Sequence, residues 1–354
     1  MTTTTAYVSR PALVLGEHVV DAARVRDDIL AWNPDHPKLE VARKALTNLP
    51  GTRRYLRPYE EIVAERSAAQ RKDDVFDVLL EAAQRAARVA MDYAGVTPAD
   101  IDCIITTSST GDRMPGLDVH LQDTLPLRPD IRRRPMTQLA CAGGAQALIM
   151  AQEYLARYPD DNVLVVAGEY LTSLYQQSLL SIEDLIYKAL WGDLVAATVV
   201  SSRPLGPDGC LRIDHSLEYV IPHTTDRYRK ETDERGDHFS STRASLRSVT
   251  DLAPALLAWL EKNTDGPLDF GILHPGGPAI LAKLATVLDV DEEFTQHSRD
   301  VLTEEGNLGG PTIFSVLERT YRTPPADGGR GLVFGLGPGV AMGALLVTWA
   351  DPQA

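Results

Sequence analysis

Residues 141–170 decide the fold: they read CAGGAQALIMAQEYLARY (141–158), then PDD, then NVLVVAGEY (162–170). In the first segment apolar residues recur every three or four positions after two glycines, which predicts a helix that those glycines open. The second segment is apolar at almost every position, and such a run is typical of a strand buried on both faces. We therefore look for the same unit, a glycine-opened helix that leads into a buried strand, in the other parts of the sequence.

The same unit recurs in the C-terminal part of the chain. GNLGGPTIFSVLERTY (306–321) opens with glycines and continues as a helix pattern, and the strand-like GLVFGLGPG (331–339) follows it. Further patterns are helices at 75–94 and 252–263, strands at 101–111 and 269–277, and a helix and strand within 182–202, whereas 1–70 and 215–245 show no regular pattern. We predict two related α/β halves, 1–205 and 206–354, with chemistry where the glycine-opened helices meet.

Composition excludes several classes of protein. Of the 354 residues 44% are hydrophobic and 24% charged, a balance typical of a folded protein with a sizeable core. With 35 basic and 49 acidic residues the formal net charge is −14, which argues against a nucleic-acid-binding surface. No apolar run approaches the roughly 18 residues that cross a bilayer, and the N-terminus does not resemble a secretory signal. Three scattered cysteines argue against a disulfide framework or a zinc site, so we expect a cytoplasmic enzyme without a metal.

Cys141 is the first candidate for catalysis, because it stands at the predicted start of a helix. Its sulfur would face the positive end of the helix dipole, which favours the thiolate, the nucleophilic form of cysteine. Gly143 and Gly144 would allow backbone amides to come close to a bound thioester. The alternative is an inert buried cysteine that packs as a small apolar residue, but such a site does not require two glycines after the thiol.

His274 and Asn307 stand at two other element boundaries. His274 ends a short apolar strand and precedes a proline and two glycines that force a turn, and Asn307 opens the second glycine-rich helix. Alone, the histidine could simply be satisfied by a backbone carbonyl, and the asparagine could be a helix cap. Together with Cys141 they form a candidate nucleophile, base and oxyanion donor.

Five short motifs follow one another along the chain. They are TTSSTGDRMPG (106–116), CAGG (141–144), HPGGPAI (274–280), Gly306-Asn307 and GLGPG (335–339). These segments resemble the motifs of the type III polyketide synthases, the chalcone-synthase-like branch of the thiolase-fold condensing enzymes, over roughly residues 40 to 350. The resemblance implies a thiolase-like α/β fold, with two βαβαβ halves in α-β-α-β-α layers, and an acyltransferase that condenses with loss of carbon dioxide.

The resemblance also implies a role for each candidate. Cys141 would take a starter acyl group from coenzyme A (CoA) as a thioester. His274 and Asn307 would hold the thioester oxygen of malonyl-CoA during decarboxylation, so that the enolate attacks the acyl-cysteine. His274 would also keep Cys141 as a thiolate through an ion pair. Repeated Claisen condensation and cyclisation would give a pyrone or phenolic product, from CoA thioesters and without a permanently bound cofactor.

The same resemblance predicts the substrate pocket. Its residues would be Ser109, Leu171, Leu174, Phe239, Gly276, Gly277 and Pro338, with Met114 reaching into the partner's pocket in a homodimer. Leu171 and Leu174 stand where plant members often carry threonines, so we expect an aliphatic or small acyl starter rather than a bulky hydroxycinnamoyl one. The two phenylalanines that commonly gate the pocket have no clear counterparts, although Phe239 or Ser241 could replace one. Trp191-Gly192-Asp193 matches a family motif that we interpret as structural.

Basic side chains near the N-terminus are candidates for the phosphates of CoA. They are Arg43, Lys44, Arg53 and Arg54, which lie where the family has basic residues. In a chain of net charge −14 such a cluster would supply local positive potential for an anionic substrate. The alternative is a solvated helix face, and the three arginines at 132–134 present the same choice.

Other functions of the thiolase-fold enzymes stay open at this point. A ketoacyl synthase III relative that uses an acyl-carrier-protein substrate, or an acyltransferase that stops after one transfer, would share the three catalytic candidates. HPGGPAI and GLGPG argue against both of these alternatives. A catalytically silent subunit that supports a partner would usually have lost the nucleophile, which is present here.

Overall fold

The computed structural model describes residues 5–234 and 236–351. Its strands are β1 (Ala6–Val8), β2 (Ala12–Leu15), β3 (His18–Asp21), β4 (Thr52–Tyr55), β5 (Cys103–Ser108), β6 (Arg132–Thr137), β7 (Asn162–Tyr170), β8 (Asp193–Ser201), β9 (Cys210–Val220), β10 (Tyr228–Asp233), β11 (Gly236–Ser241), β12 (Phe270–Leu273), β13 (Arg330–Gly337) and β14 (Ala341–Ala350).

The α-helices are α1 (Ala22–Trp32), α2 (Leu39–Thr47), α3 (Tyr59–Val63), α4 (Ala68–Ala94), α5 (Leu117–Thr124), α6 (Gly143–Arg157), α7 (Ile182–Leu190), α8 (Ser248–Asn263), α9 (Pro278–Leu288), α10 (Gln296–Glu304) and α11 (Thr312–Arg322). Short 3-10 turns include η2 (Ala140–Ala142), η3 (Leu171–Leu174) and η5 (Pro338–Val340). No helix within the described residues is long and apolar enough to span a bilayer.

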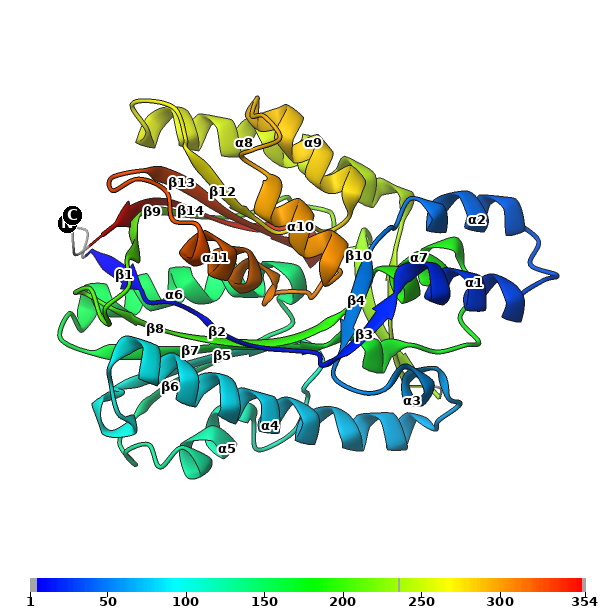
Figure 1. The fold of residues 1–354 in the computed structure, drawn as a ribbon, viewed down its shortest axis with the longest axis horizontal. Coiled ribbons are helices and arrows are strands. Elements are labelled where there is room, and N and C mark those ends of the chain that lie inside the picture. The colour runs from blue at the N-terminus through cyan, green and yellow to red at the C-terminus, as the bar shows by residue number, and fades with distance from the viewer. Residues whose placement is uncertain (1–4, 235, 352–354) are drawn as a thin grey trace.

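The elements form alternating layers of helix and sheet (Figure 1). Among the described residues ten strands form one sheet in the order β12-β13-β14-β9-β1-β8-β7-β5-β6, with β2 paired to β8. This sheet folds over near β1, so that β12, β13, β14 and β9 lie in one layer and β8, β7, β5 and β6 in another. Helices α6 and α11 lie between the two layers, α8 and α9 cover one outer side, and α4 and α5 cover the other.

The central helices meet at their N-terminal ends, where glycine permits a very close approach. A Cβ atom on Gly144 of α6 would lie 2.4 Å from the carbonyl oxygen of Gly310, just before α11. A Cβ on Gly310 would lie 2.6 Å from the carbonyl oxygen of Ala140. Both distances are far below van der Waals contact, so only glycine fits at either position. The prediction that the two glycine-opened helices meet is confirmed.

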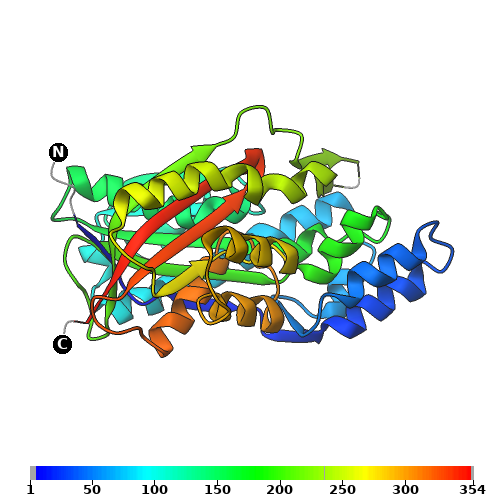
Figure 2. The same ribbon diagram turned by 90° about the horizontal axis from the view of Figure 1, so that it is seen from above.

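At one end of the sheet lies a group of helices and hairpins, of which the sequence patterns predicted only α7. Figure 2 shows α1, α2 and α7 projecting beyond the strands, at the end opposite the two chain termini. Residues 1–70 were predicted to be irregular, and the prediction is wrong for the described part, which holds β1 to β4 and α1 to α3. Residues 215–245 also lack the predicted looseness, because β10 and β11 form an antiparallel hairpin there.

The regular patterns located well the elements that they did predict. The predicted strand at 162–170 coincides with β7, all nine residues of which are buried. The predicted helix at 75–94 is the C-terminal part of α4, which begins earlier because Ser67 and Gln70 form a capping box. The predicted boundary at 205/206 falls between β8 and β9, and the division of the chain there stays a prediction.

Candidate active site

Cys141 lies in η2, directly before α6. The preceding Ala140 has a φ of +44°, a left-handed conformation that costs a non-glycine residue about 1–3 kcal/mol. The backbone N–H of Ala140 donates to Oγ of Ser109 at 2.8 Å, and this bond helps to hold the strained turn. Ser109, predicted at the pocket, therefore also positions the loop that carries the thiol.

Burial governs the charge state of Cys141. It raises the pKa of the thiol to about 12, and the negative charge of Glu169 adds to the rise. A hydrogen bond from the Asn307 side chain acts in the opposite direction. The resting form at neutral pH is therefore the thiol, and a base must take its proton when the sulfur attacks a substrate.

Glu169 is a buried carboxylate that the sequence analysis missed. It is 2% exposed and accepts hydrogen bonds from the backbone N–H groups of Ser109 (2.8 Å) and Thr110 (3.1 Å) and from the Thr110 hydroxyl (2.7 Å). Burial raises its pKa, and these hydrogen bonds counteract the rise. The sequence does hold a signal, a lone glutamate in an apolar strand, because a buried carboxylate requires donors nearby.

His274 follows β12, and β13 brings it close to the cysteine turn. Its backbone N–H donates to the carbonyl oxygen of Phe334 at 2.8 Å, and a Cβ on the next residue, Gly335, would lie 3.3 Å from the carbonyl oxygen of Cys141. The histidine is 2% exposed, and within the described residues neither ring nitrogen has a hydrogen-bond partner. Burial lowers its pKa to about 4, so the ring is neutral at pH 7 and free to accept or donate one proton.

Asn307 is held in one orientation by two hydrogen bonds. Its Oδ1 accepts from the backbone N–H of Gly309 at 2.9 Å, and its Nδ2 donates to the carbonyl oxygen of Gly276 at 3.1 Å. Because Oδ1 accepts, the second N–H of Nδ2 remains for another acceptor, and its effect on the thiol pKa places it at Cys141. Gly276 is two residues beyond His274, so the same contact ties the asparagine to the histidine turn.

The structure thus brings the three predicted catalytic residues together from both halves. The GLGPG segment packs on the cysteine loop so closely that a Cβ on Gly337 would lie 2.6 Å from the carbonyl oxygen of Leu139. Burial shifts both pKa values toward a neutral thiol and a neutral imidazole, the opposite of the expected ion pair. The ion pair stays a prediction, and it requires the attraction between the two charges to exceed the cost of burying them.

The predicted pocket residues Leu171, Leu174 and Phe239 belong to one cluster with Trp191 and Tyr187. The ring of Trp191 stacks on Tyr187 with centroids 5.0 Å apart, and its edge meets Phe239 at 5.9 Å. Bulky aromatic side chains therefore stand beside the two leucines, and they include Trp191 and Tyr187, which the sequence analysis did not place at the pocket.

The Trp191-Gly192-Asp193 segment links this cluster to Asn307. Gly192 N–H donates to the carbonyl oxygen of Asn307 at 3.0 Å, so the tryptophan backbone runs alongside Asn307. Asp193 is fully buried and accepts from the backbone N–H groups of Leu56 (3.0 Å) and Thr172 (2.9 Å), which agrees with its structural interpretation. Burial raises the pKa of Asp193 to about 7.

Three further predicted pocket residues have places in the structure. Gly277 precedes α9, and Pro338 begins η5 after β13. Met114 is 94% exposed, in the loop between β5 and α5. Its exposure leaves the side chain available to a second subunit.

The four predicted CoA residues do not form one cluster. Arg43 and Lys44 are exposed on α2, where Arg43 lies 3.5 Å from Glu40. Arg53 is 1% exposed, and its guanidinium donates to backbone carbonyl oxygens, including that of Ala189 at 2.6 Å. The prediction that Arg53 binds a CoA phosphate is therefore wrong, because the guanidinium is buried and already satisfied.

Arg54 has a backbone partner of its own, far from Arg43 and Lys44 in the sequence. Strand β4 places successive side chains on opposite faces, and Arg54 donates to the carbonyl oxygen of Gly16 at 2.7 Å. The arginines at 132–134 lie on β6, where Arg132 bonds Asp161 (3.2 Å) and Arg133 bonds Asp118 (2.8 Å). These ion pairs favour a structural role for the arginines at 132–134 over a role in binding CoA phosphates.

Known proteins match this chain along most of its length. Family models for the N-terminal and C-terminal domains of chalcone and stilbene synthases match residues 41–204 and 216–349. The chain is 31% identical to 1,3,6,8-tetrahydroxynaphthalene synthase of Streptomyces griseus over 98% of this chain and 93% of the relative. It is 28% identical to phloroglucinol synthase of Pseudomonas fluorescens over 96% of this chain and 98% of the relative.

A solved structure shows the same fold. The crystal structure of 1,3,6,8-tetrahydroxynaphthalene synthase from Streptomyces coelicolor superposes with a TM-score of 0.92 at 31% identity, covering 97% of this chain and 99% of that one. It is described as a bacterial type III polyketide synthase. Both family domains, the thiolase-like layers and the meeting of Cys141, His274 and Asn307 lead to one conclusion. This chain belongs to the chalcone and stilbene synthase family and is a type III polyketide synthase, an acyltransferase.

Proposed function

We propose that Cys141 carries the growing acyl chain and that His274 and Asn307 form the site of malonyl-CoA decarboxylation. The observation that carries this proposal is the orientation of Asn307, which directs its second N–H to the thiol. An N–H fixed in advance toward an oxyanion contributes roughly 3–4 kcal/mol to catalysis. The neutral imidazole of His274 supplies the second donor.

The acylation step needs a base because the resting thiol is protonated. Sulfur of Cys141 attacks the carbonyl carbon of the starter acyl-CoA, the thiol proton moves to a ring nitrogen of His274, and the bond to the CoA sulfur breaks. The proton then passes to the departing CoA thiolate. The pKa of His274, lowered to about 4, suits transient rather than permanent protonation.

The condensation step uses the same donors. Malonyl-CoA loses carbon dioxide, and the electron pair of the broken C–C bond forms an enolate whose oxygen accepts from Asn307 and His274. The enolate carbon attacks the acyl-cysteine, a C–C bond forms, and Cys141 leaves as the thiolate and is reprotonated. Repetition and cyclisation give a pyrone or phenolic product, as the aromatic products named for the two relatives support.

The pocket favours an aliphatic or small starter. Leu171 and Leu174 are each 9% exposed and offer apolar surface without a hydroxyl. The neighbouring aromatic rings limit the room for a bulky starter. Arg43 and Lys44, exposed on α2, remain our candidates for the CoA phosphates.

Dimerisation and location are further parts of the proposal. Met114 is 94% exposed, which suits a methionine that enters the pocket of a second subunit. Such an interface would bury roughly 2,000 Å² or more, and light scattering at micromolar concentration should give twice the mass of the chain. All three cysteines are free, which fits a reducing, cytoplasmic environment.

One experiment tests the proposed activity directly. The purified protein is incubated with malonyl-CoA alone and with a series of acyl-CoA starters, and products are identified by mass spectrometry. Products extended by two or more two-carbon units support the proposal. A single extension, a bare acyl transfer or the absence of malonyl-CoA consumption would each contradict it.

A further inference from the structure

Lys188 is a buried cation on α7 that no step of the proposed chemistry uses. It is 7% exposed, although a lysine side chain is rarely buried unless it is paired. Burial lowers its pKa to about 8, so the ammonium form still prevails at pH 7. A buried charge of this kind requires partners that offset the loss of its hydration.

The Lys188 ammonium holds one irregular segment, residues 175–181, which joins η3 to α7. Its Nζ donates to the carbonyl oxygens of Leu179 at 2.5 Å and Gln177 at 3.4 Å. It also lies 5.3 Å from the centroid of the Tyr175 ring, within the range of a cation–π contact. One charged group therefore contacts three residues of a segment in which the structure describes no helix or strand.

Both ends of this segment lead to side chains of the predicted starter pocket. Before it stand Leu171 and Leu174 of η3, and after it α7 carries Tyr187 and leads to Trp191. These four side chains belong to one apolar cluster. Lys188 follows Tyr187 directly, so its hydrogen bonds join the aromatic wall of the cluster to the chain that carries the leucines.

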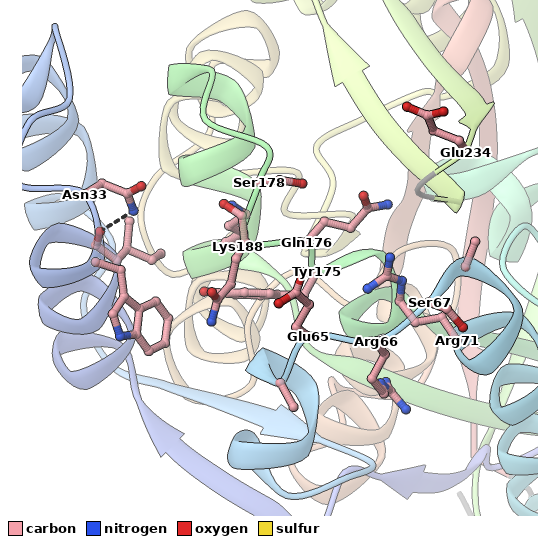
Figure 3. A pocket seen from close by; sticks show the side chains of 15 residues that line it. Asn33, Glu65, Arg66, Ser67, Arg71, Tyr175, Gln176, Ser178, Lys188 and Glu234 are labelled. Carbon is pink, nitrogen blue, oxygen red and sulfur yellow. Dashed lines mark hydrogen bonds between the residues drawn. The ribbon is translucent and has the colours of Figure 1, made fainter.

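The same stretch of chain also borders a cavity of about 540 Å³ (Figure 3). Residues 175–178 line this cavity together with Ile29 and Trp32 of α1. Figure 3 shows Lys188 beside Tyr175, on the side of the cavity that faces α1. Residues 171–174 thus belong to η3, at the pocket cluster, and residues 175–178 to the wall of the cavity.

Neutral hydrogen bonds fix this stretch at two other points. Gln176 donates from Nε2 to the carbonyl oxygen of Asp237 at 2.9 Å, and Gln177 from Nε2 to that of Val63 at 2.8 Å. A hydrogen bond from a charged donor is roughly twice as strong as a neutral one. A methionine would fill the place of Lys188 without the cost of burying a charge, so the ammonium favours a role in fixing the conformation of the segment.

We propose that Lys188 is a positioning residue that limits the length of the starter acyl chain. It holds residues 171–178 as a partition that closes the starter pocket toward the cavity, so that a long chain has no room beyond Leu174. Ile29 and Trp32 offer the apolar surface that a longer chain would reach if the partition moved. This inference rests on the proposed function, because it takes the cluster around Leu171 and Leu174 as the site of the starter.

Hydrogen exchange of the full chain tests the role of Lys188 without any catalysis. Lys188→Met keeps a long unbranched side chain but removes the ammonium, so the amides of residues 175–181 should exchange about tenfold faster. Lys262→Met makes the same change at an exposed position on α8 and should leave this exchange unaltered. Circular dichroism checks that both variants keep the fold.

The starter series is the second measurement on the same variants. Lys188→Met should raise the ratio of kcat/KM for tetradecanoyl-CoA over hexanoyl-CoA by about tenfold, mainly through a lower KM for the longer starter. Decarboxylation of malonyl-CoA without a starter should not change, because the hydrogen bonds of Lys188 go to residues 177 and 179 rather than to His274 or Asn307. A merely structural role would instead lower all of these activities together.

Gln177→Ala tests the partition by a second route. It removes the hydrogen bond to Val63 from an exposed position, so the exchange rate and the starter ratio should both rise by about two- to threefold. This variant decides the question if Lys188→Met fails to fold.

Three results would overturn the proposal. They are unaltered exchange at residues 175–181, faster exchange with an unchanged starter ratio, and an equal loss of activity for all starters. A wild-type enzyme that forms no extended product would contradict the proposed function, and this inference with it. The starter series shows that result before any variant is compared.

Discussion

The two halves of the molecule hold their proposed catalytic groups by different means. In the N-terminal half the backbone holds Cys141 in place. The residue follows a strained Ala140, whose backbone N–H is bonded to Ser109, so that the loop is fixed. In the C-terminal half the side chain of Asn307 is itself bonded twice, to Gly309 and Gly276. Substitution of the cysteine therefore tests chemistry alone, whereas substitution of the asparagine tests chemistry and structure together.

Cys141→Ala should have the largest effect on activity and little effect on stability. Loss of the nucleophile should lower turnover by on the order of 10³-fold or more, because no acyl-enzyme forms. The free energy of unfolding should change by about 1 kcal/mol or less, since only a thiol is removed. Intact-mass analysis after addition of acyl-CoA measures the first effect and urea unfolding the second. An adduct that persists, or that maps to Cys103 or Cys210, would reject the assignment.

Asn307→Ala should lower both activity and stability. Decarboxylation of malonyl-CoA should fall roughly 10²–10³-fold, while acylation of Cys141 continues. The buried partners at Gly276 and Gly309 lose their hydrogen bonds, so the free energy of unfolding should fall by roughly 1–3 kcal/mol. Thr320→Val is the matched control, because it removes one buried hydrogen bond from α11 (to Val316, 3.2 Å) away from the site. Unchanged decarboxylation in folded Asn307→Ala would return the residue to a capping role.

The pH dependence of alkylation distinguishes the neutral pair from the ion pair. Because burial raises the pKa of the Cys141 thiol, its thiolate fraction at pH 7 is small and increases with pH. The rate of reaction with iodoacetamide should therefore rise by about tenfold per pH unit between pH 7 and 9. Cys141→Ala corrects for the other cysteines. A rate already at its plateau at pH 6 would instead establish the thiolate–imidazolium pair.

Substitution of the two pocket leucines should change starter selectivity by less than the effects described above. Leu171→Thr and Leu174→Thr each add a hydroxyl that can bond a polar starter, so the preference for hexanoyl-CoA over coumaroyl-CoA should fall by about 5–30-fold. The kcat/KM values of both substrates measure this ratio. Leu257→Thr, at a 42% exposed position on α8, should leave it unchanged. A wild-type preference for coumaroyl-CoA would show that the aromatic cluster, not the leucines, determines the pocket.

The sequence predicted the buried parts of the fold better than its amphipathic edges. Strand β7 was located to the residue because a continuous apolar run has few alternatives. The first two turns of α4 were missed because they are polar, although Ser67 and Gln70 announce the helix start. Helix α1 was missed as well, since its buried residues, Ala22, Val25 and Ile29, are few among charged residues.

Site residues were predictable where they belong to a recognisable motif. They were not predictable where only tertiary packing brings them to the site. Cys141, His274 and Asn307 were found because each stands in a recognisable segment. Arg53 was misassigned because a basic run was interpreted as one surface, although alternation along a strand separates its neighbours. Trp191 was named in a motif interpreted as structural, and its place at the pocket was missed because it arises from a ring stacked on Tyr187, which no local pattern reveals.

The contact between Gly144 and Gly310 has a consequence for recombination among relatives. Each glycine leaves room for the backbone of the other half, at 2.4 and 2.6 Å from where a Cβ would stand. A chimera that joins the first half of one synthase to the second half of another inherits this seam from two parents. Such exchanges are compatible only when both parents carry glycine there, so the two halves must diverge as a matched pair.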